Sequence, residues 1–199
     1  SGLTMAESAS LLFGGMTAVS FLRRDAKLQA GERILINGAS GAVGCSSIQL
    51  AKHMGARVTA VCSSKNSDLV ASLGADRVIN YEKTEFTRTG DTYDVVMDNV
   101  GNALWARSKT ILSEKGRHLG VVSTLPEMIG AAIRPKRGDR RIFAGIAGGS
   151  AKMLNLLSDL VASGELRPVI DTIYPFEDIV AAHRHVDSGR KRGSVVIEF

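Results

Sequence analysis

The sequence predicts an α/β fold built on a doubly wound parallel sheet, in three layers of helix, sheet and helix. Three observations predict it. Six short β-rich apolar runs recur along the 199 residues, helical stretches lie between most of them, and a glycine-rich turn follows the first run. Runs such as RILIN and YDVVMD have continuous apolar centres without polar alternation, as expected of strands that helices cover on both faces. The alternation favours one domain over residues 1–199.

The predicted elements follow in chain order. Residues 1–30 have helical apolar spacing that Gly14 and Gly15 interrupt, which indicates a pair of N-terminal helices. The expected strands are Arg33–Asn37, Arg57–Val61, Arg77–Asn80, Asp94–Asp98, Arg117–Val122, Arg141–Ala144 and Ser194–Glu198. The expected helices are Val43–Met54, Asn66–Leu73, Ala103–Leu112, Lys152–Ser163 and Phe176–Asp187. Glycines at 55, 74, 116 and 164 lie where those helices should end. Residues 169–199 form a C-terminal segment with a short strand, a helix and a last strand.

Composition excludes several classes of partner. The net charge is +5, but acids are interspersed, the basic runs RPKRGDRR and RKRG are short, and aromatic residues make up only 5% of the chain. We therefore expect no nucleic-acid partner. Apolar runs fall short of the roughly 20 residues that cross a bilayer, and the start lacks the order of a secretory signal. We expect a cytoplasmic protein without a membrane partner.

The turn after the first strand reads NGASGAVG, with Gly38, Gly41 and Gly44 at intervals of three. Lying between a strand and a helix, this spacing is typical of the Rossmann fold and its dinucleotide-binding loop. Gly38 permits the tight turn, Gly41 lets the pyrophosphate approach the backbone, and Gly44 lets the helix pack closely on the sheet. The helix N-terminus then attracts the phosphates. The alternative is a purely structural turn, which the flanking strands and helix disfavour.

The second strand ends without the acid that commonly holds the ribose 2′-hydroxyl of NAD. Cys62, Ser63, Ser64 and Lys65 stand there instead. Hydroxyls and an ammonium group attract a 2′-phosphate that a carboxylate would repel. The sequence therefore predicts NADP(H) as the cofactor. In the alternative interpretation, the two serines cap the next helix and Lys65 is a solvated surface residue.

Together, the blocks ILINGASGAVG, VCSSKNSDLVASLGADRVINY, YDVVMDNVG, FAGIAGGS and GELRPVIDTIYPFEDIVAAHRHVDSGRKRGSVVI resemble the cofactor-binding half of the medium-chain dehydrogenase/reductase superfamily. The nearest branch is the zinc-independent quinone oxidoreductases, which include zeta-crystallin-like proteins and enoyl reductases. The resemblance implies NADPH-dependent hydride transfer to a quinone or an α,β-unsaturated carbonyl compound. It also implies a GroES-like domain ahead of this segment, which the 199 residues do not contain, and a possible homodimer through the sixth strand.

The resemblance also assigns cofactor contacts. Ser63–Lys65 correspond to the 2′-phosphate site, which Tyr81 flanks; a tyrosine that merely ends a strand is the alternative. By the same resemblance, residues 99–101 correspond to the segment that passes over the ribose, and Gly120, Val121 and Ser123 end the fifth strand. Residues 143–145 correspond to the backbone strip beside the nicotinamide, and 192–193 to the late pair that approaches the cofactor. The predicted contacts are Gly38, Ser40, Gly41, Ala42, Val43, Gly44, Cys62, Ser63, Ser64, Lys65, Tyr81, Asn99, Val100, Gly101, Gly120, Val121, Ser123, Phe143, Ala144, Gly145, Arg192 and Gly193.

Other sites are disfavoured. The four histidines lack metal-ligand spacing, and Ser40 does not stand in the Gly-x-Ser-x-Gly pattern of a hydrolase. Asp98, which closes an apolar strand, is expected to have a structural hydrogen-bonding role. No catalytic residue is predicted, because hydride would come from the cofactor. Two functions remain open: a reductase acting on a small-molecule acceptor, and an NADP(H)-binding module without useful turnover of its own.

Overall fold

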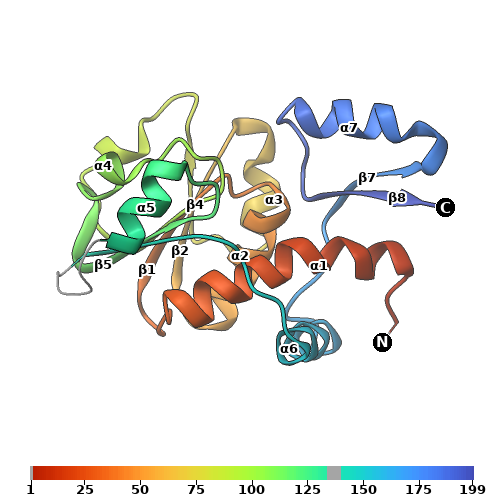
Figure 1. The fold of residues 1–199 in the computed structure, drawn as a ribbon, viewed down its shortest axis with the longest axis horizontal. Helices are drawn as coiled ribbons and strands as arrows, with labels where there is room; N and C mark the ends of the chain where they lie inside the picture. The colour runs from red at the N-terminus through yellow and green to blue at the C-terminus, as the bar shows by residue number, and fades with distance from the viewer. Residues whose placement is uncertain (1, 134–139) are drawn as a thin grey trace.

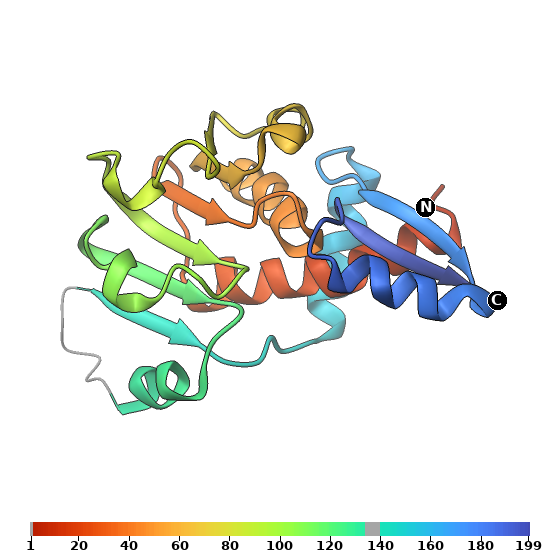
Figure 2. The same ribbon diagram turned by 90° about the horizontal axis from the view of Figure 1, so that it is seen from above.

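A computed structural model describes residues 2–133 and 140–199. Its main sheet is six-stranded and wholly parallel, with the order β3-β2-β1-β4-β5-β6, and β7 pairs with β8 in a second, two-stranded parallel sheet. Figure 2 shows the arrows of the main sheet pointing the same way, toward the β7–β8 unit. The strands are β1 Arg33–Asn37, β2 Arg57–Cys62, β3 Arg77–Asn80, β4 Tyr93–Asp98, β5 Leu112–Gly120, β6 Arg141–Ala144, β7 Ile170–Pro175 and β8 Ser194–Glu198. The doubly wound parallel sheet is confirmed.

Helices cover both faces of this sheet (Figure 1). The longer ones are α1 Met5–Val19, α2 Ala42–His53, α5 Leu125–Ile133, α6 Ala151–Ala162 and α7 Ile179–Asp187. The shorter ones are η1 Ser20–Asp25, η2 Ser64–Asn66, α3 Ser67–Ser72, η3 Phe86–Arg88, α4 Trp105–Ser108 and η4 Phe176–Asp178. Successive strand residues point to opposite faces, so Ile34 and Ile36 belong to one apolar core and Leu35 to the other. Both faces of the central strand are thus buried.

The N-terminal helix is not interrupted, which corrects the expected helix pair. α1 runs through Gly14 and Gly15 and continues into a π-helix at Ser20. A Cβ at Gly14 would lie 2.4 Å from the carbonyl oxygen of Ala42, and one at Gly15 would lie 2.9 Å from a methyl group of Leu157. The two glycines therefore let α1 pack closely against α2 and α6 rather than ending the helix.

We expect Gly14→Ala to lower the free energy of unfolding by up to about 2 kcal/mol. Forcing α1 away from the α2 backbone costs about 1–3 kcal/mol, and the better helix propensity of alanine returns about 1 kcal/mol. Gly130→Ala is the matched control, because nothing lies within 4 Å of a Cβ built there in α5; it should stabilise by up to about 1 kcal/mol. Denaturant unfolding of both variants measures the difference, and a Gly14→Ala protein as stable as the control would contradict the close packing.

The segment after β4 also differs from expectation. Instead of a helix over Ala103–Leu112, only the single turn α4 forms, and β5 begins already at Leu112 and ends at Gly120. Gly116, expected to end a helix, lies inside β5, where the pairing with β4 shifts between Tyr93 and Val95. A Cβ at Gly116 would lie 2.8 Å from that of Leu112. This glycine therefore serves an irregular stretch of strand. The helix α5 was not expected.

The expectation that apolar runs fall short of a membrane-spanning length does not hold for the N-terminal helix. The continuous helix Met5–Asp25, with 21 residues and a mean hydropathy of 1.3, is long and apolar enough to cross a membrane by length and composition. Its most apolar window is 61% buried inside the protein, and α1 contacts α2, α6 and β8. A core helix of a soluble protein meets the same test of length and composition. Of the basic run RPKRGDRR, residues 134–139 lie outside the described residues.

Candidate functional site

The strand ends of the main sheet lie level with one another. Asn37 pairs in register with Val61 on one side and Asp98 on the other, and Gly120 in turn pairs with Asp98 and Ala144. The predicted contacts from Gly38 to Gly145 follow these strand ends or close them. The structure therefore brings them together along the carboxyl edge of the sheet, where open α/β sheets bind ligands.

The glycine loop has the geometry that its spacing predicts. Gly38 adopts a φ of 71°, a left-handed conformation that favours glycine. A Cβ at Gly44, in the first turn of α2, would lie 2.3 Å from the carbonyl oxygen of Gly38 and 2.6 Å from the carbonyl carbon of Ala39. At Gly41, which precedes α2 in extended backbone, a Cβ would make only an ordinary contact at 3.6 Å. Backbone conformation and packing thus require glycine at positions 38 and 44. At position 41 packing would tolerate a side chain, so the glycine there leaves the backbone open to a ligand.

The C-terminal segment docks on this loop. The amide of Gly193 donates to the carbonyl oxygen of Ser40 at 2.8 Å, and Gly193 forms an isolated parallel bridge with Gly41. Lys191 donates from Nζ to the Gly193 carbonyl at 2.8 Å, and burial lowers the pKa of its ammonium group. Gly193 is buried, whereas Arg192 beside it is exposed. Gly193, one of the two late positions that the resemblance assigned to the cofactor, thus lies against the glycine loop.

Asp98 organises the loop after β4. The residue is 2% exposed, and its carboxylate accepts hydrogen bonds from Nδ2 of Asn37 at 2.8 Å and from the amides of Val100, Gly101 and Ala103 at 2.7–3.1 Å. Four donors satisfy a buried carboxylate that would otherwise be costly. The expected structural role of Asp98 is confirmed, and the carboxylate fixes the backbone of the predicted contacts 99–101.

The segment after β2 contacts an acid, Glu82, that the sequence analysis missed and that follows β3. Ser64 donates from its amide and its hydroxyl to Oε2 of Glu82, at 3.2 and 3.0 Å. Ser63 precedes η2 without a capping side-chain bond, so neither serine caps the next helix. Tyr81, just before the acid, is 58% exposed. Cys62 and Asn80 end the paired strands β2 and β3, so Ser64 and Glu82, each two residues further on, lie beside one another. The strand order of this fold was therefore the signal that could have identified the contact.

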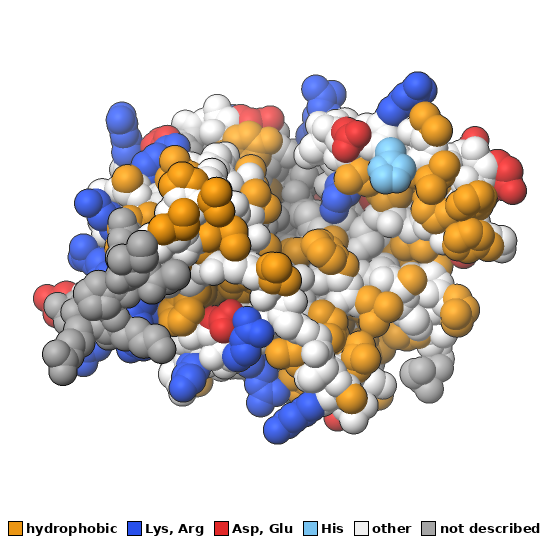
Figure 3. All heavy atoms as spheres, in the orientation of Figure 1, with side chains coloured by type: hydrophobic (Ala, Val, Ile, Leu, Met, Phe, Trp, Pro, Cys, Tyr) orange, Lys and Arg blue, Asp and Glu red, His pale blue; other side chains and the backbone are white. Residues whose placement is uncertain are grey.

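The end of β5 carries the predicted cofactor contacts Gly120, Val121 and Ser123. The hydroxyl of Ser123 donates to the Gly120 carbonyl at 2.8 Å, and a Cβ at Gly120 would lie 2.3 Å from that hydroxyl oxygen. The amide of Val121 donates to the Asp98 carbonyl at 3.0 Å. Apolar side chains gather over α5 near this end (Figure 3). The exposed apolar residues around it include Val100, Val122, Leu125 and Ile129.

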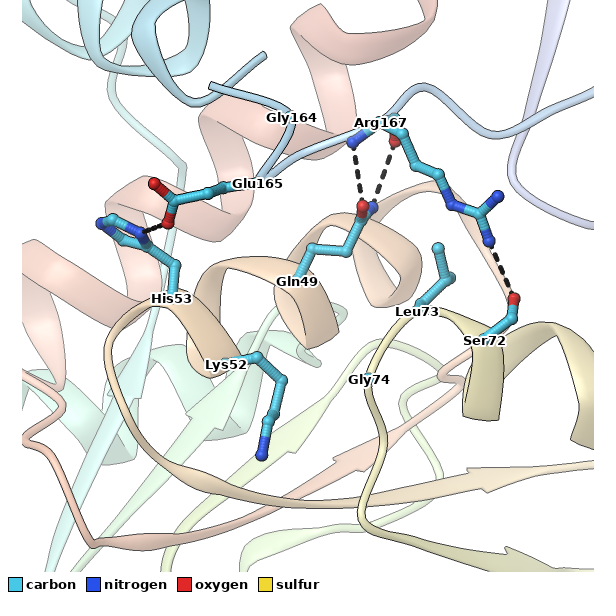
Figure 4. Close-up of a pocket in the computed structure, with 9 residues that line it drawn as sticks. All are labelled: Gln49, Lys52, His53, Ser72, Leu73, Gly74, Gly164, Glu165 and Arg167. Atoms are coloured by element: carbon cyan, nitrogen blue, oxygen red, sulfur yellow. Dashed lines mark hydrogen bonds and ion pairs between the residues drawn. The ribbon is translucent and has the colours of Figure 1, made fainter. Parts of the chain in front are cut away.

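A cavity of about 530 Å³ lies elsewhere, at the C-terminal ends of α2 and α3 (Figure 4). Its charged side chains are engaged within the protein. His53 contacts the carboxylate of Glu165, and Arg167 donates to the hydroxyl of Ser72 at 2.8 Å. Since the glycine loop is at the opposite end of α2, this cavity is separate from the predicted dinucleotide site.

Comparison with known proteins gives consistent relatives. Residues 73–197 match the family model described as "Zinc-binding dehydrogenase". The chain is 34% identical to 2-methylene-furan-3-one reductase of Solanum lycopersicum, over 98% of this chain and 47% of that protein. It is 32% identical to the mitochondrial NAD(P)H oxidoreductase RTN4IP1 of Homo sapiens, over 98% of this chain and 56% of the relative. Among solved structures it is similar to the quinone oxidoreductase from Coxiella burnetii, with a TM-score of 0.89 and 30% identity over 99% of this chain and 62% of that one. The chain thus spans about half to three fifths of the length of these relatives.

The family description names zinc, a metal that proteins bind through Cys, His, Asp and Glu side chains. Within residues 2–133 and 140–199, no group of three or more His, Cys, Asp or Glu side chains could hold a metal ion. Cys45 is buried, and burial raises the pKa of its thiol to about 12, so it is not a ready thiolate ligand. The described residues therefore do not fit a zinc site.

Proposed function

We propose that this chain, which belongs to the zinc-binding dehydrogenase family within the medium-chain dehydrogenase/reductase superfamily, is the cofactor-binding part of an NADPH-dependent oxidoreductase. The observation that carries the proposal is the glycine loop. Gly38 and Gly44 fold it tightly, and the first amides of α2 beside Gly41 have no partner within the helix. Such amides suit the pyrophosphate of a dinucleotide. When bound, the cofactor would supply the hydride.

The residues of this chain hold and orient that group. Gly41 and the first turn of α2 receive the pyrophosphate, Ser64 and Lys65 the 2′-phosphate, and the loop that Asp98 fixes lies over the ribose. The ends of β5 and β6 border the nicotinamide, with the backbone of Ala144 and Gly145 beside it. The names of the relatives support a quinone or an α,β-unsaturated carbonyl compound as that acceptor.

A second function is favoured by one observation. The chain spans only 47–62% of the three relatives compared above, and in this family the acceptor cleft lies between the two halves. Acting alone, these 199 residues would therefore bind NADP(H) without useful turnover. Steady-state NADPH oxidation with 1,4-benzoquinone, 9,10-phenanthrenequinone and a crotonyl thioester separates the two: turnover supports the reductase, and background rates despite measured cofactor binding support the binding module.

We expect Lys65→Ala to weaken NADPH binding about tenfold while NADH affinity changes less than about twofold, because a charge-assisted contact to phosphate contributes about 1.4 kcal/mol or more. Fluorescence or calorimetric titration with both cofactors measures the preference. Lys115→Ala is the control: Lys115 is also exposed but lies near the amino end of β5. Tighter binding of NADH than of NADPH by the wild type, or an equal loss of both in Lys65→Ala, would contradict the 2′-phosphate assignment.

A further inference from the structure

An acidic side chain already lies on the donors that the proposed function assigns to the 2′-phosphate. Both the amide and the hydroxyl of Ser64 point at the same oxygen of Glu82. Two donors converging on one atom make a small anion site. In this structure the occupant of that site is a carboxylate of the chain itself.

The position of Glu82 follows from the backbone around it. Cys62 and Asn80 are partners at the ends of β2 and β3, and the Tyr81 amide donates to the Cys62 carbonyl at 3.2 Å. The Glu82 amide donates to Oδ1 of Asn80 at 2.9 Å, which fixes the turn after β3. The carboxylate is therefore directed toward Ser64 by ordered strand ends, although both side chains are exposed.

The carboxylate is also held in its charged form. The Ser64 amide, then its hydroxyl, and to a smaller degree the charge of Lys65 lower the pKa of the Glu82 carboxyl. Near neutral pH, the group that accepts these hydrogen bonds is therefore an anion. A 2′-phosphate that took its place would carry a charge of the same sign.

We propose that Glu82 is a specificity-determining residue, whose carboxylate competes with the cofactor 2′-phosphate for Ser64 and Lys65 and so reduces the preference for NADP(H) over NAD(H). The inference rests on the proposed function, because it requires a dinucleotide at this edge. To bind, the phosphate must displace the carboxylate from the Ser64 donors, and the displaced charge stays nearby and repels it. A cofactor with a free 2′-hydroxyl carries no such charge, and the carboxylate is an acceptor suited to that hydroxyl.

The test is Glu82→Gln, titrated with adenosine 2′,5′-bisphosphate and with 5′-AMP at one fixed, low ionic strength. These probes differ only in the 2′-phosphate and need no turnover. We expect the variant to bind the bisphosphate about fivefold more tightly, because it removes one like charge at short range. Affinity for 5′-AMP should change less than about twofold, since that probe lacks the repelled group. Glu114→Gln, with the same change of charge near the amino end of β5, should change neither affinity.

Each outcome decides something different. A raised affinity for the bisphosphate alone supports the competition. An unchanged or weaker bisphosphate affinity in Glu82→Gln, or an equal gain for both probes, overturns it while leaving the proposed function intact, provided that NADPH still binds. Failure of wild type and variants to bind either probe or either dinucleotide overturns the proposed function and this inference together. Thermal unfolding of each variant establishes that the comparison is between folded proteins.

Discussion

Replacement of Asp98 by alanine is expected to lower the free energy of unfolding by about 3–5 kcal/mol, among the largest effects that one side chain of this protein can have. The carboxylate is 2% exposed and accepts from Asn37 and from the amides of Val100, Gly101 and Ala103. Alanine leaves these donors without their acceptor in a buried place, and each unpaired group costs about 1–3 kcal/mol. Part of that cost is recovered where loop amides turn to water.

Denaturant unfolding measures this loss of stability, with one intermediate variant and one control variant for comparison. Asp98→Asn keeps the size and one acceptor oxygen but turns an amide donor toward backbone N–H groups, so it should fall between wild type and alanine. Asp187→Ala removes an exposed acid at the end of α7 and should change stability by less than about 0.5 kcal/mol. If Asp98→Ala were as stable as Asp187→Ala, the loop after β4 would not depend on the carboxylate.

The central strands β1, β2 and β4 were predictable because each is a local apolar run that is buried along most of its length. The failures come from glycines whose meaning depends on a partner element. Gly14 and Gly15 look like a helix break in sequence, yet they are contact points for α2 and α6. Gly116 looks like a helix end, yet it belongs to an irregular strand. A local pattern cannot distinguish a glycine that breaks an element from one that lets another element approach.

The candidate site likewise has a part that local sequence predicts and a part that depends on which elements become neighbours. The loop from Gly38 to Gly44 is a contiguous strand, turn and helix, so its backbone geometry could be foreseen from spacing. The carboxylate of Glu82 could not, because its contact with Ser64 exists only when β2 and β3 are neighbours. The bridge from Gly193 to Gly41 likewise joins distant parts of the chain. The glycine loop could be predicted because its residues are contiguous in the sequence. The contacts of Glu82 and Gly193 could not, because they depend on which strands and segments become neighbours in the fold.

Gly44→Ala is expected to weaken binding of NADPH and NADH together by more than about thirtyfold and to lower stability by about 2–4 kcal/mol. Its Cβ would lie 2.3 Å from the Gly38 oxygen and 2.6 Å from the carbonyl carbon and oxygen of Ala39. These are backbone atoms, so relief requires moving the phosphate loop or the start of α2. Both cofactors share the pyrophosphate and should lose affinity equally, unlike the selective loss expected for Lys65→Ala. Titration with each cofactor, combined with denaturant unfolding, measures both effects.

Gly41→Ala separates packing from ligand binding at the same loop. Its Cβ would meet the Gly38 oxygen only at 3.6 Å, and its φ of −80° suits any residue. Stability should therefore stay within about 1 kcal/mol of wild type. If the pyrophosphate approaches the backbone at Gly41, the added methyl group occupies that space, and both dinucleotides should bind at least about tenfold more weakly. Wild-type affinity in a stable Gly41→Ala protein would mean that the phosphates lie elsewhere on the edge. Weak binding with intact stability would make the open backbone at Gly41 a property that serves the ligand rather than the fold.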